Sequence, residues 1–497
     1  MKLLKLFLVV FLQIYAEATP SVLIVGSGPA GIAAATRLLE HSYKNIRVLE
    51  AENRIGGRIN SVFFGQAFVD LGAESCHGTK GNIVFDMVKH LDVLKHVDGP
   101  RNVYHSSRKQ VDKEFGDELL RIIESIYGPD GQRDEDEGTS VGHYCLDKYN
   151  ATIYDKYQKN PEKLEIAKSS INLFHHIVLS YEGAFSWFEP SAKSDYRDCE
   201  GDLSLNWNGL GYKTVLEVMM KKFPNPSEQL PFDETVLLNK EVIKVFWNES
   251  SSHDSVTVYC SDHTSFTADH IIFTPSIGVL KERHESMFSP ELPDAKRGAI
   301  KHIGFGAVMK VAMYFKHRWW ENERNFTGFH FVWSQDDKSR VFKEFPEGPL
   351  KDGHSWLTEF FCVVPVDRNP NVLVGWLTGS MVPEIELMTN ETLINGLEFV
   401  LNKFLGHKYN ITGPDSIIRT YWHTNPHFRG SYSYQTVESR KDKITAQMEL
   451  AKPILNLEGR PILQFAGEAS HPYFYSTVHG AIETGFREAD RIINSYK

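Results

Sequence analysis

The segment VLIVGSGPAGIAAATRLLE, residues 22–40, constrains the fold of this chain more than any other part of the sequence. Four apolar residues run into three glycines spaced G-x-G-x-x-G, and a helix-forming pattern follows. This order predicts a strand over 22–25, a tight turn and a helix over 29–40, and the next apolar run predicts a strand over 46–50. A βαβ unit of this kind is typical of α/β domains that bind a nucleotide.

Each glycine has a predicted role in that turn. Gly26 permits the sharp bend, Gly28 lets the backbone approach a pyrophosphate, and Gly31 lets the helix pack on its strand. The helix begins near Ala30 with free N–H groups and the positive end of its dipole, which together favour an anion. Glu50, at the end of the second strand, suits a ribose hydroxyl and would repel a ribose 2′-phosphate. The alternative is a helix-packing loop that binds no ligand.

The residues that follow Glu50 narrow the choice of nucleotide. They read EAENRIGGRINS, an acid followed by R-x-G-G-R. This pattern resembles the extended fingerprint of FAD-dependent amine oxidases. The resemblance implies that Gly57 and Arg58 lie along the FAD pyrophosphate, where a guanidinium offers the diphosphate a fork of donors.

Three further segments resemble the same family. They are LLNKEVIKVFW (237–247), ADHIIFTPSIGVLK (268–281) and QFAGEASHPYFYSTVHGAIETGFREADRI (464–492). The resemblance implies that the backbone near Val242 contacts the adenine and that Glu468 reaches the ribitol. It also implies that the N–H of Val478 opens a helix aimed at flavin O2, where a helix N-terminus stabilises the negative charge of reduced flavin. We therefore expect FAD as the cofactor.

Within that family, the polyamine and spermine oxidase branch is the most similar. LGAESCHG (71–78) resembles the G-A-x-W-x-H-G segment of this branch, which implies that His77 lies in the substrate tunnel beside the flavin. The segment departs from the pattern at Ser75 and Cys76, where the branch has an aromatic and an aliphatic residue. FGAVMKV resembles the segment whose lysine, here Lys310, binds a water near flavin N5. A lysine in so apolar a strand needs a buried partner or water, because an isolated buried charge is costly.

The segment RGSYSYQTV resembles the part of the family that forms an aromatic wall before the flavin, and it places Tyr432 there. In the monoamine oxidases this segment carries a cysteine bonded to the flavin. Ser431 stands at that position here, so we expect noncovalent FAD. Ser476 and Thr477, which precede the final helix, correspond to small polar residues close to the flavin and the substrate amine.

The resemblance implies oxidation of a polyamine: spermine, spermidine or an N-acetylated form. A hydride would pass from the carbon next to an amine to flavin N5, giving an aminoaldehyde, a shorter amine and, with dioxygen, hydrogen peroxide. One alternative is an L-amino-acid oxidase on the same scaffold, with Arg429 available to bind a carboxylate. Another is a secreted flavin-binding protein without turnover.

An acidic segment offers partners for the cationic ends of a polyamine. Its candidates are Glu182, Glu189, Asp195, Glu200 and Asp202. The interpretation that we favour is a solvated loop. The net charge of −10 makes nucleic acid a poor partner, and the spacing of the cysteines and histidines predicts no metal site.

A chain of 497 residues suits two domains. We expect a mixed α/β (α+β) fold with a Rossmann-like FAD-binding domain and a discontinuous substrate-binding domain that combines a mixed sheet with helices. The FAD-binding domain is predicted from 19–78, 205–300 and 415–497, and the substrate-binding domain from 79–204 and 301–414. Residues 128–138 read as an exposed acidic loop.

The first 18 residues have the form of a secretory signal peptide: a basic start, an apolar run and an A-x-A site at 16–18. We therefore expect a secreted or secretory-lumen protein, and no later run is apolar enough to span a membrane. Five N-x-S/T sequons fit that route, at Asn150, Asn248, Asn325, Asn390 and Asn410. Five cysteines leave one or two disulfides possible, with a connectivity that the sequence does not give. The sequence does not indicate an oligomeric state.

Overall fold

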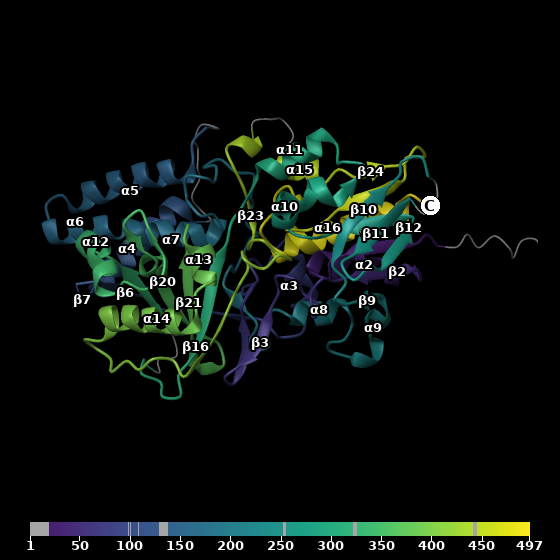
Figure 1. The fold of residues 1–497 in the computed structure, drawn as a ribbon. Coiled ribbons are helices and arrows are strands. Elements are labelled where there is room, and N and C mark those ends of the chain that lie inside the picture. The colour runs from purple at the N-terminus through teal and green to yellow at the C-terminus, as the bar shows by residue number, and fades with distance from the viewer. Residues whose placement is uncertain are drawn as a thin grey trace, which may run out of the picture.

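A computed structural model describes residues 19–497 apart from 98, 100, 108, 129–137, 252–254, 322–325 and 441–444. The described chain forms two lobes, which meet where β3 (Ser61–Phe64) and β23 (Ser433–Gln435) lie (Figure 1). The predicted signal peptide, most of the predicted acidic loop and the Asn325 sequon lie outside the described residues.

The first lobe is built on a six-stranded sheet in the order β24-β25-β13-β1-β2-β9. The strands are β24 (Ile454–Leu455), β25 (Pro461–Phe465), β13 (His270–Phe273), β1 (Val22–Val25), β2 (Ile46–Leu49) and β9 (Val236–Leu237). Neighbours are parallel except for β24, which pairs antiparallel at one edge. Strands β1, β13 and β25 are buried along their whole length, as in parallel sheets covered on both faces. The predicted βαβ unit and the α/β class are confirmed.

One face of this sheet is covered by α2 (Pro29–Glu40) and α16 (Val478–Asn494), which pack against each other. A Cβ on Gly485 would lie 2.2 Å from the carbonyl oxygen of Ala30, so this close approach requires glycine. Shorter helices complete the layer: α3 (Ile83–Val88), α8 (Thr214–Met219) and α9 (Phe232–Thr235).

The other face packs against a four-stranded sheet and three helices. The strands are β12 (Ser265–Ala268), β11 (Val256–Cys260), β10 (Val242–Trp247) and β14 (Phe288–Ser289), and the helices are α10 (Ile277–Met287), α11 (Asp294–His302) and α15 (Ala446–Leu450). Both faces of the central sheet are therefore buried, which leaves the carboxyl ends of its strands as the open edge.

The second lobe is built on a seven-stranded sheet in the order β22-β16-β21-β20-β17-β6-β7. The strands are β22 (Ser416–Arg419), β16 (Val308–Tyr314), β21 (Asn369–Thr378), β20 (Phe360–Val366), β17 (Phe329–Val332), β6 (Asn102–His105) and β7 (Lys109–Gln110). Only β17 and β6 are parallel neighbours in this mixed sheet. Strand β22 begins just after the predicted domain boundary at residue 415, but it pairs with β16 in the seven-stranded sheet. The second lobe therefore extends past that boundary.

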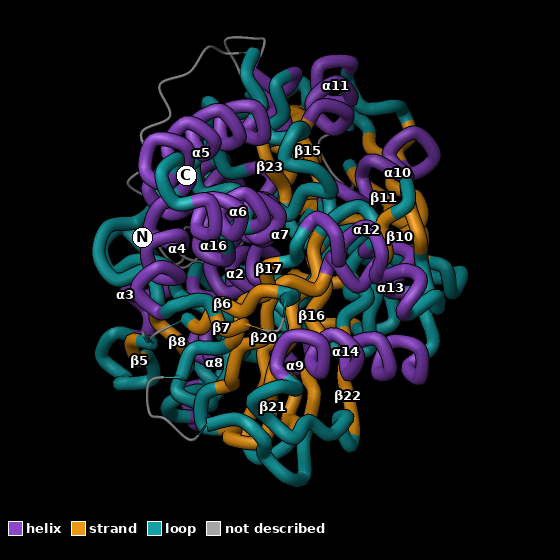
Figure 2. Tube along the Cα trace, turned by 90° about the vertical axis from the view of Figure 1, so that its left-hand side faces the viewer, coloured by secondary structure: helices purple, strands orange, loops and turns teal. Residues whose placement is uncertain are grey.

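Helices cover both faces of the seven-stranded sheet. One core joins it to α4 (Lys113–Tyr127), α5 (Val141–Tyr157), α6 (Pro161–Ser169) and α7 (Ile171–Glu182). The other core joins it to α12 (Gln335–Glu344), α13 (Val382–Glu386) and α14 (Asn390–Leu405). Figure 2 shows the strands of this sheet in orange, with α4 to α7 gathered above them.

The remaining elements are short. They are β4 (Ala67–Asp70), β5 (Lys95–His96), β8 (Leu205–Asn206), β15 (Ile303–Phe305), β18 (Leu350–Lys351), β19 (His354–Ser355), η1 (Pro226–Glu228), η2 (Trp356–Glu359), η3 (Glu438–Arg440) and η4 (Glu468–Ser470). All five cysteines are buried, and no disulfide joins them in this structure. Within the described part of the chain, no helix is both long and apolar enough to cross a bilayer.

Candidate active site

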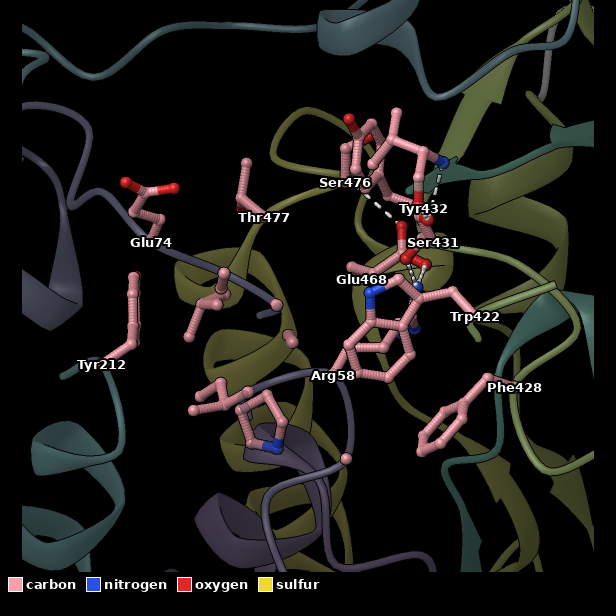
Figure 3. A pocket seen from close by; sticks show the side chains of 18 of the residues that line it. Arg58, Glu74, Tyr212, Trp422, Phe428, Ser431, Tyr432, Glu468, Ser476 and Thr477 are labelled. Atoms are coloured by element: carbon pink, nitrogen blue, oxygen red, sulfur yellow. Dashed lines mark hydrogen bonds and ion pairs between the residues drawn. The ribbon is translucent and has the colours of Figure 1, made fainter. Parts of the chain in front are cut away.

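A cavity of about 810 Å³ lies between the two lobes. It runs from the glycine turn after β1, past the start of α16, to the strands of the seven-stranded sheet. In the view of Figure 3, Glu74 and Thr477 lie on one side of an open space, and Tyr432 and Trp422 lie on the other. Residues from both lobes therefore line one continuous site.

The glycine turn forms one end of the cavity. Gly26 has a φ of +96°, and a Cβ on Gly31 would lie 2.0 Å from the carbonyl oxygen of Gly26, so the turn and the close helix need both glycines. Gly57 has a φ of +57°, and a Cβ there would lie 3.1 Å from the Cα of Gly28. The backbones of Gly28 and Gly57 therefore lie in contact and leave a hollow that side chains would fill. We call this hollow, at the glycine turn, the cradle.

Helix α2 points its N-terminus into this cradle. Gly28 is its N-cap and supplies no side-chain hydrogen bond, so the N–H groups of the first turn, around Ala30, stay without an intrahelical partner. An anion at this point would receive those donors and the positive end of the helix dipole.

Glu50 follows β2 at the edge of the cradle and is 6% exposed. Its Oε2 accepts hydrogen bonds from the backbone N–H of Ser27 at 2.7 Å and from the Ser27 hydroxyl at 2.6 Å. Its Oε1 accepts from the N–H of Glu52 at 2.9 Å. These bonds fix the carboxylate beside the cavity, where the sequence predicts a ribose contact.

Arg58 and Glu468 form an ion pair in the cavity wall. Nη1 of Arg58 lies 2.8 Å from Oε1 of Glu468 and also donates to the carbonyl of Ser431 at 2.6 Å (Figure 3). The other oxygen of Glu468 accepts from the Ser433 hydroxyl at 2.6 Å and from the N–H of Ser476 at 2.9 Å. Both predicted cofactor contacts therefore line the cavity, and each also holds the other in place.

Helix α16 begins at Val478, at the edge of the cavity. Thr477 is its N-cap: its hydroxyl accepts from the N–H of Gly480 at 3.0 Å and donates to the carbonyl of Phe474 at 2.7 Å. The cap leaves the N–H of Val478 without an intrahelical partner. Ser476, just before the cap, has a φ of +68°, a conformation that is uncommon for a residue other than glycine.

These features fit an FAD. An anion cradle at α2, a carboxylate at Glu50 and a second helix N-terminus at Val478 lie along one cavity. Val242, at the start of β10, lines the same cavity beside a bulge in the pairing of β10 with β11. FAD would therefore be held by the predicted residues without any covalent bond, since the residue at the position of the flavin-bonded cysteine is Ser431.

Lys310 lies on β16 and is 3% exposed. Its ammonium donates to the carbonyls of Asp70 at 3.1 Å and Gly72 at 3.0 Å and to Oε2 of Glu74 at 2.7 Å. The ring of Trp376 lies 4.3 Å from the Lys310 nitrogen, measured to the ring centroid. The partner that the buried lysine requires is therefore Glu74, a partly exposed residue that the sequence analysis did not single out.

His77 and Tyr432, two further predicted site residues, line the same cavity. Nδ1 of His77 lies 2.7 Å from the carbonyl oxygen of Leu203, so this nitrogen is the donor of the hydrogen bond, and Nε2 is the acceptor of the neutral ring. The Tyr432 hydroxyl donates to the carbonyl of Ser180, and burial raises the pKa of Tyr432 above its usual value. Trp422, which the sequence analysis left out of the site, also lines the cavity and is buried.

Four cavity-lining residues form a row across the seven-stranded sheet. Lys310 pairs with Trp376, Trp376 with Cys362, and Cys362 with His330, in successive antiparallel strands. Directly opposed residues point to the same face of a sheet, and three strand spacings span roughly 14 Å. The row ends in uncharged groups, because burial and Arg101 lower the pKa of His330 to about 3 and burial raises the pKa of Cys362.

The predicted acidic candidates have separate places. Glu182 lines the cavity and accepts a hydrogen bond from the hydroxyl of Tyr127. The others pair with the protein: Glu189 with Tyr434, Asp195 with Arg440, Glu200 with Lys80 and Asp202 with His96. Asp198, which was not among the candidates, also lines the cavity.

Arg429, the residue that an amino-acid oxidase would need, does not line the cavity. Its guanidinium holds the carboxylate of Glu282 at 2.5 and 2.8 Å. No group of histidine, cysteine, aspartate and glutamate among the described residues has the arrangement of a metal site.

Sequence reasoning missed Glu74, Trp376, Cys362 and His330. Trp376, Cys362 and His330 become site residues only through strand register, which local spacing does not reveal. Glu74 becomes a site residue through a loop contact, although it lies inside the LGAESCHG segment that the sequence analysis considered. The signal that could have identified Glu74 is the buried Lys310, which requires a partner for its charge.

Comparisons with known proteins agree with this geometry. A family described as flavin containing amine oxidoreductase matches residues 29–493. The peroxisomal N(1)-acetyl-spermine/spermidine oxidase of Homo sapiens is 31% identical, with 96% of each chain covered. The probable polyamine oxidase 5 of Arabidopsis thaliana is 26% identical, covering 96% of this chain and 98% of its own. A solved structure of wild-type putrescine oxidase bound to putrescine has the same fold, with a TM-score of 0.63, 18% identity and coverage of 96% and 99%.

Proposed function

The chain belongs to the flavin-containing amine oxidoreductase family and is an FAD-dependent oxidoreductase, and we propose that it oxidises polyamines, namely spermine, spermidine or their N-acetylated forms. The observation that carries the proposal is the long cavity wall from Lys310 to His330, which offers an extended chain roughly 14 Å of contact beyond the reaction centre. The names of the relatives with matching full-length chains support the same substrate class.

The side chains around the cavity suit a long cationic amine. Glu182 and Asp198 place carboxylates on the lining, where they would attract ammonium groups. Trp376, Trp422 and Tyr432 supply apolar surface for the methylene segments between them. The lining therefore offers both carboxylates and apolar surface to a ligand made of amines and methylenes.

The reacting amine must be neutral before its carbon can release a hydride. Bound FAD supplies the hydride acceptor and passes the electrons to dioxygen, which leaves as hydrogen peroxide. His77 would accept the proton of the substrate ammonium at Nε2, since its Nδ1 proton is held by the carbonyl of Leu203. The aromatic residues would exclude water and orient the C–H bond. The imine product is then hydrolysed to an aminoaldehyde and a shorter amine.

The position of Arg429 argues against amino acids as substrates. Recognition of an α-carboxylate needs a free guanidinium in the cavity. Arg429 is already paired with Glu282 outside the lining. Arg429 therefore does not supply the carboxylate contact that an amino-acid oxidase on this scaffold would need.

A panel of substrates tests this proposal. Purified holoenzyme is incubated with spermine, spermidine, their N-acetylated forms, a monoamine and a set of L-amino acids, and peroxide and products are measured. The proposal predicts peroxide with one or more of the polyamines and an aminoaldehyde beside a shorter amine. Peroxide with amino acids alone would favour the alternative oxidase, and peroxide with none would favour a flavin-binding protein without turnover.

We further propose that the enzyme enters the secretory pathway and acts on luminal or extracellular polyamines. The support is the form of residues 1–18 and the exposure of the four sequon asparagines that the structure describes, Asn150, Asn248, Asn390 and Asn410. Expression in a eukaryotic secretory host, with N-terminal sequencing and glycosidase treatment of the medium, tests this. A mature chain that begins near Thr19 and carries glycans is expected; an unglycosylated cytosolic protein that retains Met1 contradicts the route.

A further inference from the structure

The ammonium of Lys310 has every donor occupied by the protein. An ammonium carries three N–H donors, and the three acceptors around it are the carbonyls of Asp70 and Gly72 and the carboxylate of Glu74. Among the described residues, Glu74 alone brings a negative charge into direct contact with the ammonium, at 2.7 Å. The two carbonyls satisfy hydrogen bonds but leave the charge of the lysine uncompensated.

Glu74 is the more exposed member of this pair, and both residues line the cavity. Its side chain is 32% exposed and lines the cavity, whereas the Lys310 side chain is 3% exposed. Residues 71–78 follow β4 as an irregular segment, so a hydrogen bond from Lys310 to Gly72 and the ion pair to Glu74 tie one loop to β16. Figure 3 shows Glu74 among the residues that line the cavity.

We propose that Glu74 is a positioning residue for Lys310: it keeps the buried amine in its charged form and holds it at the wall of the reaction centre. The role of Lys310 in the reaction rests on the proposed function, but the pairing with Glu74 does not. A buried ammonium that loses its counter-charge is destabilised relative to the neutral amine. The charged form of Lys310 would then be lost at a lower pH than in the intact pair.

Other titratable groups face this pair, and their effects on a pH profile must be distinguished from the effect of the pair. Asp70 on β4 has a buried carboxyl whose pKa is raised to about 7 by burial, with Glu74 adding to the rise. Cys362 on β20 interacts electrostatically with Glu74, and His77 lies on the same loop. Trp376 on β21 and Thr420, which hydrogen-bonds the Lys310 backbone, are uncharged.

The test measures pH profiles of the two flavin half-reactions in the holoenzyme. Flavin reduction by one amine substrate is followed without oxygen, and reoxidation by dioxygen is followed after chemical reduction with dithionite, which needs no amine. The variants are E74Q, which keeps the shape and removes the charge, E74D, which keeps the charge, K310M, and the double variant E74Q/K310M. FAD content and thermal stability are measured for each variant.

In the half-reaction that K310M slows, E74Q should move the loss of rate at high pH to lower pH by at least one unit, so that its rate above the wild-type midpoint falls at least about tenfold relative to wild type. E74D should restore most of the wild-type profile. In the K310M background, E74Q should produce no further shift. The sign follows from the lysine, whose charged form exists below its midpoint and is lost as pH rises.

Three results would overturn the proposal. An E74Q profile that coincides with wild type would mean that Glu74 does not hold the charge of Lys310. A shift that persists in the K310M background would assign the effect to Asp70 or His77. A K310M variant with wild-type rates in both half-reactions would mean that Lys310 has no role in the reaction, so Glu74 could not act through it. If no amine reduces the wild-type flavin, the proposed function fails, and the reoxidation profiles still decide the role of Glu74.

Discussion

Replacing Glu468 with Gln should cost far more than its conservative shape suggests, because both oxygens of this buried carboxylate accept from donors. Oε1 faces the guanidinium of Arg58, and Oε2 faces the hydroxyl and N–H of Ser433 and the N–H of Ser476. A glutamine has one oxygen, so its NH₂ must face donors on one side whichever way it turns.

The less costly orientation puts the NH₂ toward Arg58. This orientation removes one charge-assisted hydrogen bond, worth about 1.5–3 kcal/mol, and adds a donor–donor contact beside a guanidinium that is largely buried. We therefore expect the unfolding free energy of Glu468→Gln to fall by about 2–4 kcal/mol. We also expect weaker FAD binding, since Arg58 and Ser476 would lose the anion that fixes them.

Glu282→Gln is the matched control. It removes the carboxylate partner of Arg429 from a pair whose side chains are 31% and 43% exposed. Exposed pairs contribute about 0–1 kcal/mol. Denaturant unfolding of both variants, with FAD content from absorbance, measures the contrast. A Glu468→Gln protein whose stability and FAD content match those of Glu282→Gln would refute the reasoning about the buried pair.

Three other substitutions test separate parts of the account. Gly57→Ala should lower FAD content with the chain still folded, because φ is +57° and the new Cβ would lie 3.1 Å from the Cα of Gly28; the ratio of flavin to protein absorbance measures it, and full occupancy contradicts the cradle. Lys310→Met should slow flavin reduction or reoxidation with FAD retained, and rapid mixing that finds wild-type rates in both would remove the lysine from the mechanism. Burial raises the pKa of Glu359 to about 8 from the 4.5 of an exposed carboxyl, so the native state holds its proton more tightly and wild-type stability should fall as pH rises from about 4.5 to 8. Glu359→Gln should remove that decline, so that between pH 5 and pH 8 the variant should lose a few kcal/mol less unfolding free energy than wild type. Parallel pH curves for the two proteins would contradict this prediction.

Local pattern was enough to predict the nucleotide half of the molecule. The turn from Gly26 to Gly31 needs glycine because a Cβ would clash with the backbone there. Glu50 follows at the end of a short strand, so residues that are close in the sequence are also close in space. The C-terminal helix was equally readable, since it opens at a capping threonine, Thr477, and begins at Val478 as predicted.

The substrate half was less readable because its contacts are long-range. Lys310, Trp376 and His330 come into one row through the register of four strands whose order in the sheet differs from their order in the chain. Nothing in the sequence around Arg429 indicates that Glu282 occupies its guanidinium. The partner of Lys310 was predictable in kind, as a buried acceptor, but its identity as Glu74 depended on how the loop after β4 returns to β16.

The most direct test of the central claim is anaerobic mixing of the holoenzyme with a polyamine while the flavin absorbance near 450 nm is followed. The account predicts that spermine, spermidine or an N-acetylated form bleaches the flavin at a rate that saturates with amine concentration, and that oxygen restores the colour with one peroxide per flavin. Flavin that stays oxidised with every polyamine, in protein that is folded and loaded with FAD, would contradict the claim that this cavity oxidises polyamines.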